Sequence, residues 1–210
     1  MQSFKRHMPW LLFTPLLAAG ALFFWLSGPA PPLPQARAAI QVDPVPEVVR
    51  PPYKSEDYRR QKIKERWLMP LAERQRRLWP LIRRYARQMG LDPALVMAVV
   101  HVESKFLPAA ISNRGAIGLM QLTPLTARQL GLEDPLDLEA NLEAGTRYLA
   151  QLKRYFQDDL VLTLAAYNAG PTRVEKEGRV PDIEETQDFV IQVLGQVDYF
   201  RQRFQSLAKG

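Results

Sequence analysis

The feature that most limits how this chain can fold is an uncharged apolar run near its start. Trp10–Leu26 holds seventeen residues without a charged side chain, which is short for a membrane-spanning helix and long for a signal-peptide core. Lys5 and Arg6 precede the run, whereas the first basic residue after it is Arg37. Because basic residues favour the cytoplasmic side of a membrane, the run predicts a single-pass anchor with everything after it outside the cytoplasm.

A cleaved signal peptide and a buried core helix are the alternative interpretations of this run. Small residues that suit a cleavage site occur at Gly28–Ala30 and again at Ala36–Ala38, although the second group lies far from the apolar core. The 25 residues from Gly28 to Pro52 include eight prolines. Because proline fixes φ and lacks an amide donor, we expect an extended linker. The sequence thus predicts a membrane anchor or signal segment over 1–27 and a linker over 28–55.

The formal net charge of +6 is divided unevenly along the chain. Residues 1–55 carry 5 basic and 2 acidic side chains (+3), 56–90 carry 11 and 4 (+7), and 91–210 carry 12 and 16 (−4). Apolar residues in 56–90 recur at helical spacing, which predicts a basic amphipathic helical region that packs on the domain, with breaks at Pro70 and Pro80. Attraction to anionic lipid or polymer is a second interpretation of its basic face. Without a nucleic-acid motif, and outside the cytoplasm, we expect no nucleic-acid partner.

Cysteine is absent, and His7 and His101 are the two histidines. The chain therefore has no disulfide, thiol nucleophile or cysteine-based zinc site, and a histidine-rich metal centre is excluded. We expect neither a metal nor a cofactor. His101 lies three residues before Ser104, but no neighbouring acid is evident to orient the imidazole. We therefore interpret His101 as a packing or surface residue and not as half of a catalytic pair.

The chemistry is predicted at Glu103, near the end of an apolar helix. Asp92–Pro93 has the residues of a helix start, and the helix is expected to reach about Phe106. Glu103 shares one helix face with three valines, Val96, Val99 and Val100. Apolar surroundings disfavour the ionised carboxylate and raise its pKa, which a general acid at neutral pH requires. The alternative is a structural carboxylate paired with Lys105 or Arg114.

The segments after Glu103 carry turn and capping signals. Asn113–Gly115 lies between short β-compatible pieces and predicts a small hairpin. Thr123–Pro124 predicts the start of a helix, and Gly170–Pro171 predicts the end of one. Gly118 permits a positive φ or a close approach of another group to its backbone.

Together these pieces resemble the soluble lytic transglycosylase (SLT) domain family. The resemblance runs from about Pro93 to Val193, and the order and spacing of its short motifs are specific. The matching residues are Glu103–Phe106, Pro108, Ala110, Ser112, Gly115–Gln121, Pro124, Thr126–Ala127, Asn141, Gly145, Tyr148–Leu149 and Ala166–Gly170. The resemblance implies a mainly α-helical, lysozyme-like fold (α+β by convention) with a small β-hairpin beside a cleft. It further implies a catalytic domain over 91–207, preceded by the N-terminal membrane helix, and bacterial peptidoglycan glycan strands as the substrate.

The resemblance also assigns roles to residues. Glu103 would protonate the glycosidic oxygen between N-acetylmuramic acid and N-acetylglucosamine, and would then act as base on the muramyl C6 hydroxyl to close a 1,6-anhydro ring. The residues implied to bind or surround the substrate are Ser104, Ser112, Gly118, Met120, Gln121, Tyr167 and Asn168. Between Ser104 and Leu132 the chain has no Asp or Glu, so a second carboxylate on the hairpin is missing. This absence favours intramolecular attack over the two-carboxylate mechanisms, although a remote acid such as Asp137 can fold back.

One position departs from the family pattern. Phe189 stands where the late helix motif of the family usually has a tyrosine, and a phenyl ring cannot donate the hydrogen bond near the catalytic carboxylate. Tyr167 or Tyr199 can compensate. The leading hypothesis is a lytic transglycosylase in the bacterial inner membrane with its catalytic domain in the periplasm, or a soluble periplasmic form if the leader is cleaved. A peptidoglycan-binding protein with vestigial activity and a hydrolysing muramidase are the alternatives.

Overall fold

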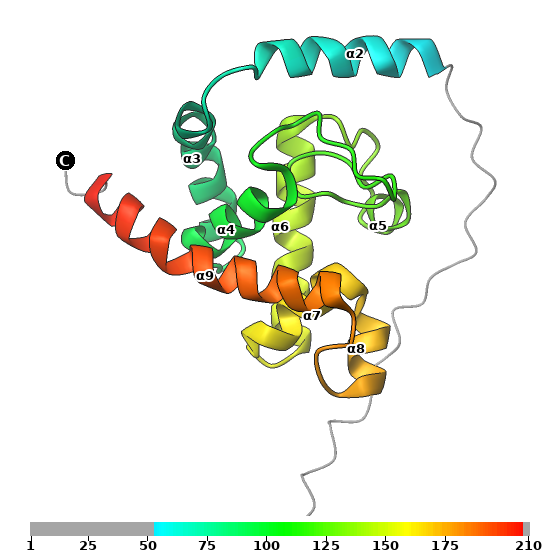
Figure 1. Cartoon of the computed structure of the whole chain (residues 1–210), viewed down its shortest axis with the longest axis vertical. Helices are drawn as coiled ribbons and strands as arrows, with labels where there is room; N and C mark the ends of the chain where they lie inside the picture. The colour runs from blue at the N-terminus through cyan, green and yellow to red at the C-terminus, as the bar shows by residue number, and fades with distance from the viewer. Residues whose placement is uncertain (1–52, 208–210) are drawn as a thin grey trace, which may run out of the picture. The chain divides into compact units, whose positions relative to one another are not determined.

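The computed structural model describes residues 53–207, whose backbone is mainly helical, as predicted (Figure 1). The predicted anchor or signal segment, and the linker up to residue 52, lie outside the described residues. In the part of the chain that is described, no helix has the length and apolarity to cross a membrane. The helices are α2 (Tyr53–Arg66), α3 (Leu71–Gln88), α4 (Pro93–Ser104), α5 (Pro124–Gln129), α6 (Leu138–Tyr155), α7 (Leu160–Ala169), α8 (Pro171–Glu177) and α9 (Glu184–Leu207).

Helix α3 begins directly after Pro70, as predicted, but the predicted break at Pro80 is wrong. Pro80 lies inside the helix and is exposed. A proline in a helix interior removes one backbone hydrogen bond and costs about 3 kcal/mol. Leu78 and Ile82 on either side of it are almost completely buried in the same core as α4. Because each buried aliphatic side chain contributes about 1.5–3 kcal/mol, this packing keeps the helix continuous. The boundary predicted at residue 90, between the basic helical region and the catalytic domain, stays a prediction.

Helix α4 is the central helix of the described domain and contacts both α3 and α9. Its start is as predicted: the Asp92 carboxylate accepts a hydrogen bond of 2.8 Å from the backbone amide of Ala94, and Pro93 occupies the first turn. Every residue from Ala94 to Val100 is buried. The helix ends at Ser104, two residues before the predicted end, because Lys105 takes a left-handed conformation with φ of 50°.

The segment between α4 and α5 contains no extended strand among the described residues, so the expected hairpin is not confirmed. Two isolated antiparallel bridges, Ile111 with Ile117 and Ile117 with Leu122, take its place. The predicted turn is present, since the Gly115 amide donates to the Ser112 carbonyl at 2.9 Å. Pairing stops after single residues because Gly118 has φ of 87°, which turns the chain out of an extended course.

In the second half of the domain, α7 contacts α6, α8 and α9, and α9 in turn contacts α4. α7 ends as predicted, with Gly170 at φ of 90° and Pro171 starting α8. In Figure 1, α9 forms the long orange-to-red helix that passes α7 and α4, and it contacts both of them. Helices α3, α4, α6, α7 and α9 contribute to one apolar core, whose fully buried members include Ile82, Val100, Leu149, Leu164 and Phe200. This core fixes the end of α4, where Glu103 lies.

Candidate active site

Glu103 is the penultimate residue of α4, and its side chain is half-buried. Burial raises the pKa of its carboxyl to about 8, and the negative charge of Glu185 adds to the rise. The sequence-based prediction of a raised pKa is therefore confirmed. Within the described chain, Glu103 makes no hydrogen bond or ion pair with another residue. The alternative pairing with Lys105 or Arg114 is not found. A carboxyl group in this state holds its proton at neutral pH and can donate it.

Glu185, in the first turn of α9, is the acid that acts on Glu103 electrostatically. It forms an ion pair with Arg114 of the turn between α4 and α5, at 2.7 Å. Glu185 was not assigned a role from the sequence, although it lies four residues before Phe189 in the same helix. Neither it nor Arg114 was predicted to contact the other, because 70 positions separate them along the chain. The remote acid considered from sequence, Asp137, instead caps α6 by accepting from the Ala140 amide.

The loop between α4 and α5 (residues 105–123) follows Glu103 and is held against α4 and α6 by buried polar side chains. The Ser104 hydroxyl lies 2.8 Å from the Leu119 carbonyl and 3.1 Å from the Val100 carbonyl. Asn141, which is fully buried, accepts from the Met120 amide at 3.0 Å and donates to the Ile117 carbonyl at 2.9 Å. Through its hydrogen bond to the Leu119 carbonyl, Ser104 holds the loop against the end of α4. Its predicted contact with substrate stays a prediction.

Two glycines allow the loop to lie directly on α6. A Cβ at Gly118 would come within 2.3 Å of the Asn141 side-chain nitrogen, and one at Gly145 would come within 2.6 Å of the Met120 sulfur. Contacts this short are not tolerated, so both positions require glycine. Met120 itself is fully buried, and its side chain belongs to the core.

The other predicted substrate residues are arranged around the same loop. The Gln121 side-chain amide donates to the carbonyls of Gly118 and Ala110, at 2.9 and 3.1 Å. The Ser112 hydroxyl accepts from the Ala116 amide at 3.0 Å. The side-chain oxygen of Asn168, Oδ1, accepts a hydrogen bond of 2.7 Å from the Thr186 hydroxyl, which leaves the side-chain NH₂ group of Asn168 for other partners.

Tyr167 lies on the α7 side of Glu103. Its hydroxyl donates to the Met120 carbonyl at 2.8 Å, and burial raises its pKa well above 10, with the charge of Glu103 contributing. Phe189 is buried and stacks on the Tyr167 ring, with centroids 6.2 Å apart and the planes 6° from parallel. Tyr199 is about half exposed and lies beside Arg203. Of the two candidate replacements for the missing hydroxyl, Tyr167 is therefore the one coupled electrostatically to Glu103.

His101 is a packing residue, as the sequence predicted. Its ring lies 5.8 Å from that of Phe106 and 5.7 Å from that of Phe200, between centroids. Burial lowers its pKa, and the charge of Lys105 lowers it further. Its Nδ1 atom is buried without a hydrogen-bond partner, and the Ser104 hydroxyl bonds to backbone carbonyls, so the described residues show no Ser–His pair.

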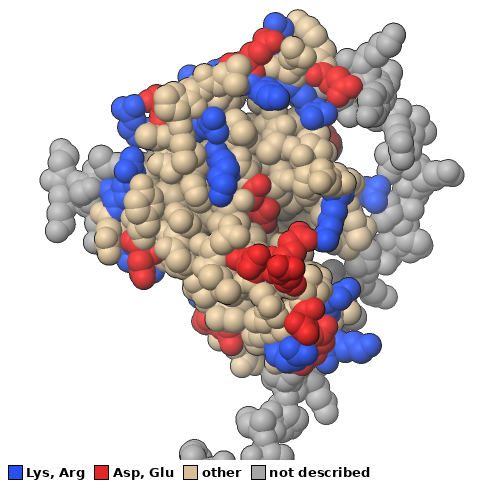
Figure 2. All heavy atoms as spheres, in the orientation of Figure 1, with Lys and Arg blue, Asp and Glu red and all other residues tan. Residues whose placement is uncertain are grey.

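The surface around the site is uneven in charge. Figure 2 shows acidic side chains gathered over the N-terminal part of α9, whose first turn holds Glu184 and Glu185.

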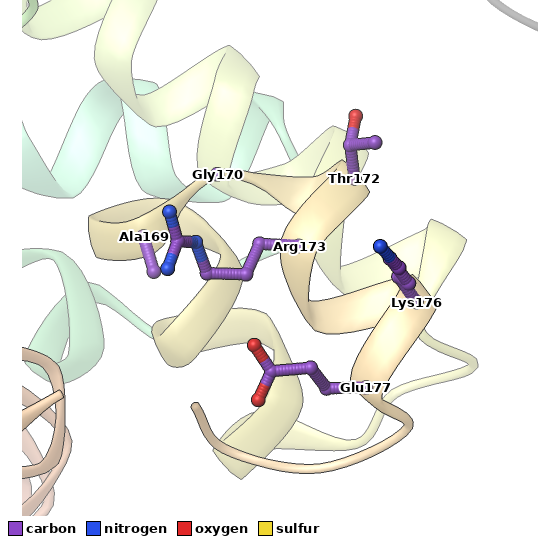
Figure 3. A pocket seen from close by; sticks show the side chains of 6 residues that line it. All are labelled: Ala169, Gly170, Thr172, Arg173, Lys176 and Glu177. Carbon is purple, nitrogen blue, oxygen red and sulfur yellow. The ribbon is translucent and has the colours of Figure 1, made fainter. Parts of the chain in front are cut away.

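Among the residues that the structure describes, no group of three metal-ligating side chains occurs. A surface pocket at the junction of α7 and α8 contains none of the predicted site residues (Figure 3). Its lining is Ala169, Gly170, Thr172, Arg173, Lys176 and Glu177.

The sequence model of the Transglycosylase SLT domain family matches residues 80–190, just over half of the chain. The chain belongs to this family. Over 100 residues it is 43% identical to the membrane-bound lytic murein transglycosylase F of Desulfosudis oleivorans, a match covering 45% of this chain and 22% of that protein. It is 33% identical over 144 residues to the soluble lytic murein transglycosylase of Escherichia coli K12, covering 58% and 22%.

Solved structures support the expected lysozyme-like class of this SLT domain. The crystal structure of the 70 kDa soluble lytic transglycosylase from Escherichia coli superposes with a TM-score of 0.53 at 30% identity, covering 60% of this chain and 24% of that one. An inactive mutant of the lytic transglycosylase Slt from Pseudomonas aeruginosa gives 0.54 at 29% identity, with the same coverage. The matches span about a fifth to a quarter of the length of these relatives.

Proposed function

We propose that this SLT-domain protein is a peptidoglycan lytic transglycosylase. It cleaves the β-1,4 bond between N-acetylmuramic acid and N-acetylglucosamine and leaves a 1,6-anhydromuramyl end. The observation that carries the proposal is the state of Glu103: a half-buried carboxyl with a pKa of about 8, without a hydrogen-bonding or ionic partner among the described residues. A group in this state donates a proton to a leaving oxygen and takes one back afterwards.

Proton donation is the first role of Glu103 in this mechanism. At neutral pH the carboxyl is protonated because its pKa lies near 8, so it can protonate the glycosidic oxygen as the bond breaks. The carboxylate that results then removes the proton of the muramyl C6 hydroxyl, whose oxygen attacks C1 of the same sugar. The proton balance is zero, and no water enters the product.

The distribution of acidic residues favours this route over the two-carboxylate routes of most glycosidases. Those routes require a second carboxylate placed to act as nucleophile or as base on a water molecule. The segment between α4 and α5, which follows Glu103, carries no Asp or Glu. Glu185 acts on Glu103 from α9, where its side chain is exposed. Attack by the substrate's own C6 hydroxyl needs no such group.

Purified sacculi provide the test of this function. The full chain should release soluble fragments that mass spectrometry identifies as anhydromuramyl-ended, and Glu103→Gln should release none while keeping the helical circular dichroism spectrum. Reducing muramic ends would indicate the hydrolysing muramidase. Intact glycan would indicate the binding protein with vestigial activity. Either result overturns the proposal.

We also propose that residues 1–27 anchor the protein in the bacterial inner membrane with the SLT domain in the periplasm. The support is the apolar run Trp10–Leu26 and the placement of basic residues before it. Intact-mass analysis of protein purified from membranes should give the uncleaved chain. A chain that starts after residue 27 and is recovered from the soluble periplasmic fraction would contradict the anchor.

A further inference from the structure

The ion pair between Arg114 and Glu185 connects two segments that meet near Glu103. Arg114 lies in the turn between α4 and α5, and Glu185 lies in the first turn of α9, with 2.7 Å between the charged atoms. Glu185 is close enough to Glu103 to raise its pKa. The Arg114 guanidinium is therefore held by the acid that acts on the proposed catalytic carboxyl, although Arg114 forms no ion pair with Glu103.

This ion pair is easily exchanged. The side chains of Arg114 and Glu185 are 75% and 54% exposed, and an ion pair this exposed contributes little to stability. A carboxylate from a ligand can replace Glu185 at little cost. The planar guanidinium of arginine binds carboxylates through two parallel hydrogen bonds, so Arg114 has the chemistry for this exchange.

Arg114 is a positive charge beside an acidic surface on the N-terminal part of α9. Figure 2 shows that the N-terminal part of α9 is covered by acidic side chains, and Glu184, Glu185 and Asp188 belong to it. An anionic ligand that approaches Glu103 from this side meets repulsion from those carboxylates. Arg114 offers it a compensating positive charge once Glu185 is displaced.

We propose that Arg114 forms a subsite for a carboxylate on the peptide side chains of the glycan strand, and that Glu185 occupies this subsite when no strand is bound. The inference rests on the proposed function, because it takes peptidoglycan as the ligand. The hydroxyl and acetamide groups of the sugars are neutral, whereas the peptide side chains carry free carboxylates. The subsite therefore distinguishes strands that bear charged peptides from strands that do not.

The test measures equilibrium binding of two matched ligands to the full-length chain. The ligands are peptide-bearing glycan strands and the same strands after their carboxylates have been converted to amides. Binding is measured in the Glu103→Gln background, so that no turnover occurs. With Arg114 present, amidation should weaken binding by a factor of up to about five, as expected when an exposed ion pair is lost. Arg114→Gln should weaken binding of the unmodified strands by the same factor and should bind both ligands equally.

Matched variants separate the subsite from general effects of charge. Arg87→Gln removes an exposed arginine on α3 and should leave the preference for unmodified strands intact. Arg114→Lys keeps the charge and should restore part of the preference. Equal binding of both ligands by the protein that retains Arg114 would overturn the inference. So would a preference that survives Arg114→Gln. Failure of the proposed function is seen separately, as absence of turnover by the chain that retains Glu103.

Discussion

Replacement of Glu103 by glutamine should stabilise the protein at neutral pH while abolishing its activity. Glutamine has nearly the shape of protonated glutamate and carries no ionisable group. Glu103 has no ionic or hydrogen-bonding partner in the described chain, so the substitution breaks no hydrogen bond or ion pair. The stability difference between the two proteins should therefore come from the ionisation of Glu103 alone.

The magnitude follows from the two pKa values of Glu103. In the folded state the pKa is about 8, against 4.5 for the unperturbed group. Below pH 4.5 the carboxyl is protonated in both states and contributes nothing. As the pH rises, the unfolded chain ionises first, so the stability of the folded protein falls until about pH 8. At pH 7 the loss is 2.5 units at about 1.36 kcal/mol each, or about 3 kcal/mol at most, since the side chain keeps some contact with water.

Urea unfolding followed by tryptophan fluorescence measures this difference. The free energy of unfolding of Glu103→Gln should equal that of the parent near pH 4, and should exceed it by up to about 3 kcal/mol at pH 7. Glu133→Gln, at an exposed glutamate, is the control and should match the parent at every pH. A difference that is constant with pH, or a Glu103→Gln protein less stable than the parent at pH 7, would refute the reasoning.

Three further predictions concern the neighbours of Glu103. Glu185→Gln should lower the pKa of Glu103 and move the alkaline limb of the pH–activity profile to lower pH, whereas an unmoved limb would exclude the coupling. Because burial lowers the pKa of His101, the stability it contributes is present above pH 6.5 and falls as the pH drops; urea unfolding of His101→Leu should lack this acid loss, and an identical loss would contradict it. Gly145→Ala should lower the free energy of unfolding by about 1–3 kcal/mol, because the added methyl group overpacks against Met120. The control Gly195→Ala, in α9 with nothing within 4 Å of the new Cβ, should be neutral or stabilising. Equal effects of the two substitutions in thermal unfolding would show that close packing of Met120 against α6 is not required.

Local signals predicted the parts of the fold that depend on local chemistry. The cap at Asp92, the helix start at Thr123 and the glycine end of α7 are all present, because each is formed within a few residues. Pro80 was predicted to break α3, and this was wrong because burial on the opposite helix face outweighs a lost backbone hydrogen bond. The hairpin was expected from its turn residues, but strand pairing also requires extended backbone on either side of the turn. Gly118 has a positive φ, so the backbone is not extended there.

The candidate site was predictable only in part. Spacing within one helix was enough to predict the raised pKa of Glu103, since the three valines and the glutamate are fixed by helix geometry, whereas its catalytic role was implied by the family resemblance and stays a proposal. The ion pair of Arg114 with Glu185 depends on how α9 packs against α4, which no local pattern encodes. The same holds for Asn141, whose buried side chain fastens the loop from a separate helix.

The central claim is that one carboxyl group cleaves the glycan by intramolecular ring closure. Digestion of sacculi in oxygen-18-labelled water, followed by mass spectrometry of the muramic ends, tests it most directly. The account predicts anhydromuramyl ends that contain no heavy oxygen from the chain with Glu103, and no new ends from Glu103→Gln. Reducing ends that carry one heavy oxygen would show that water is the nucleophile and would contradict the account.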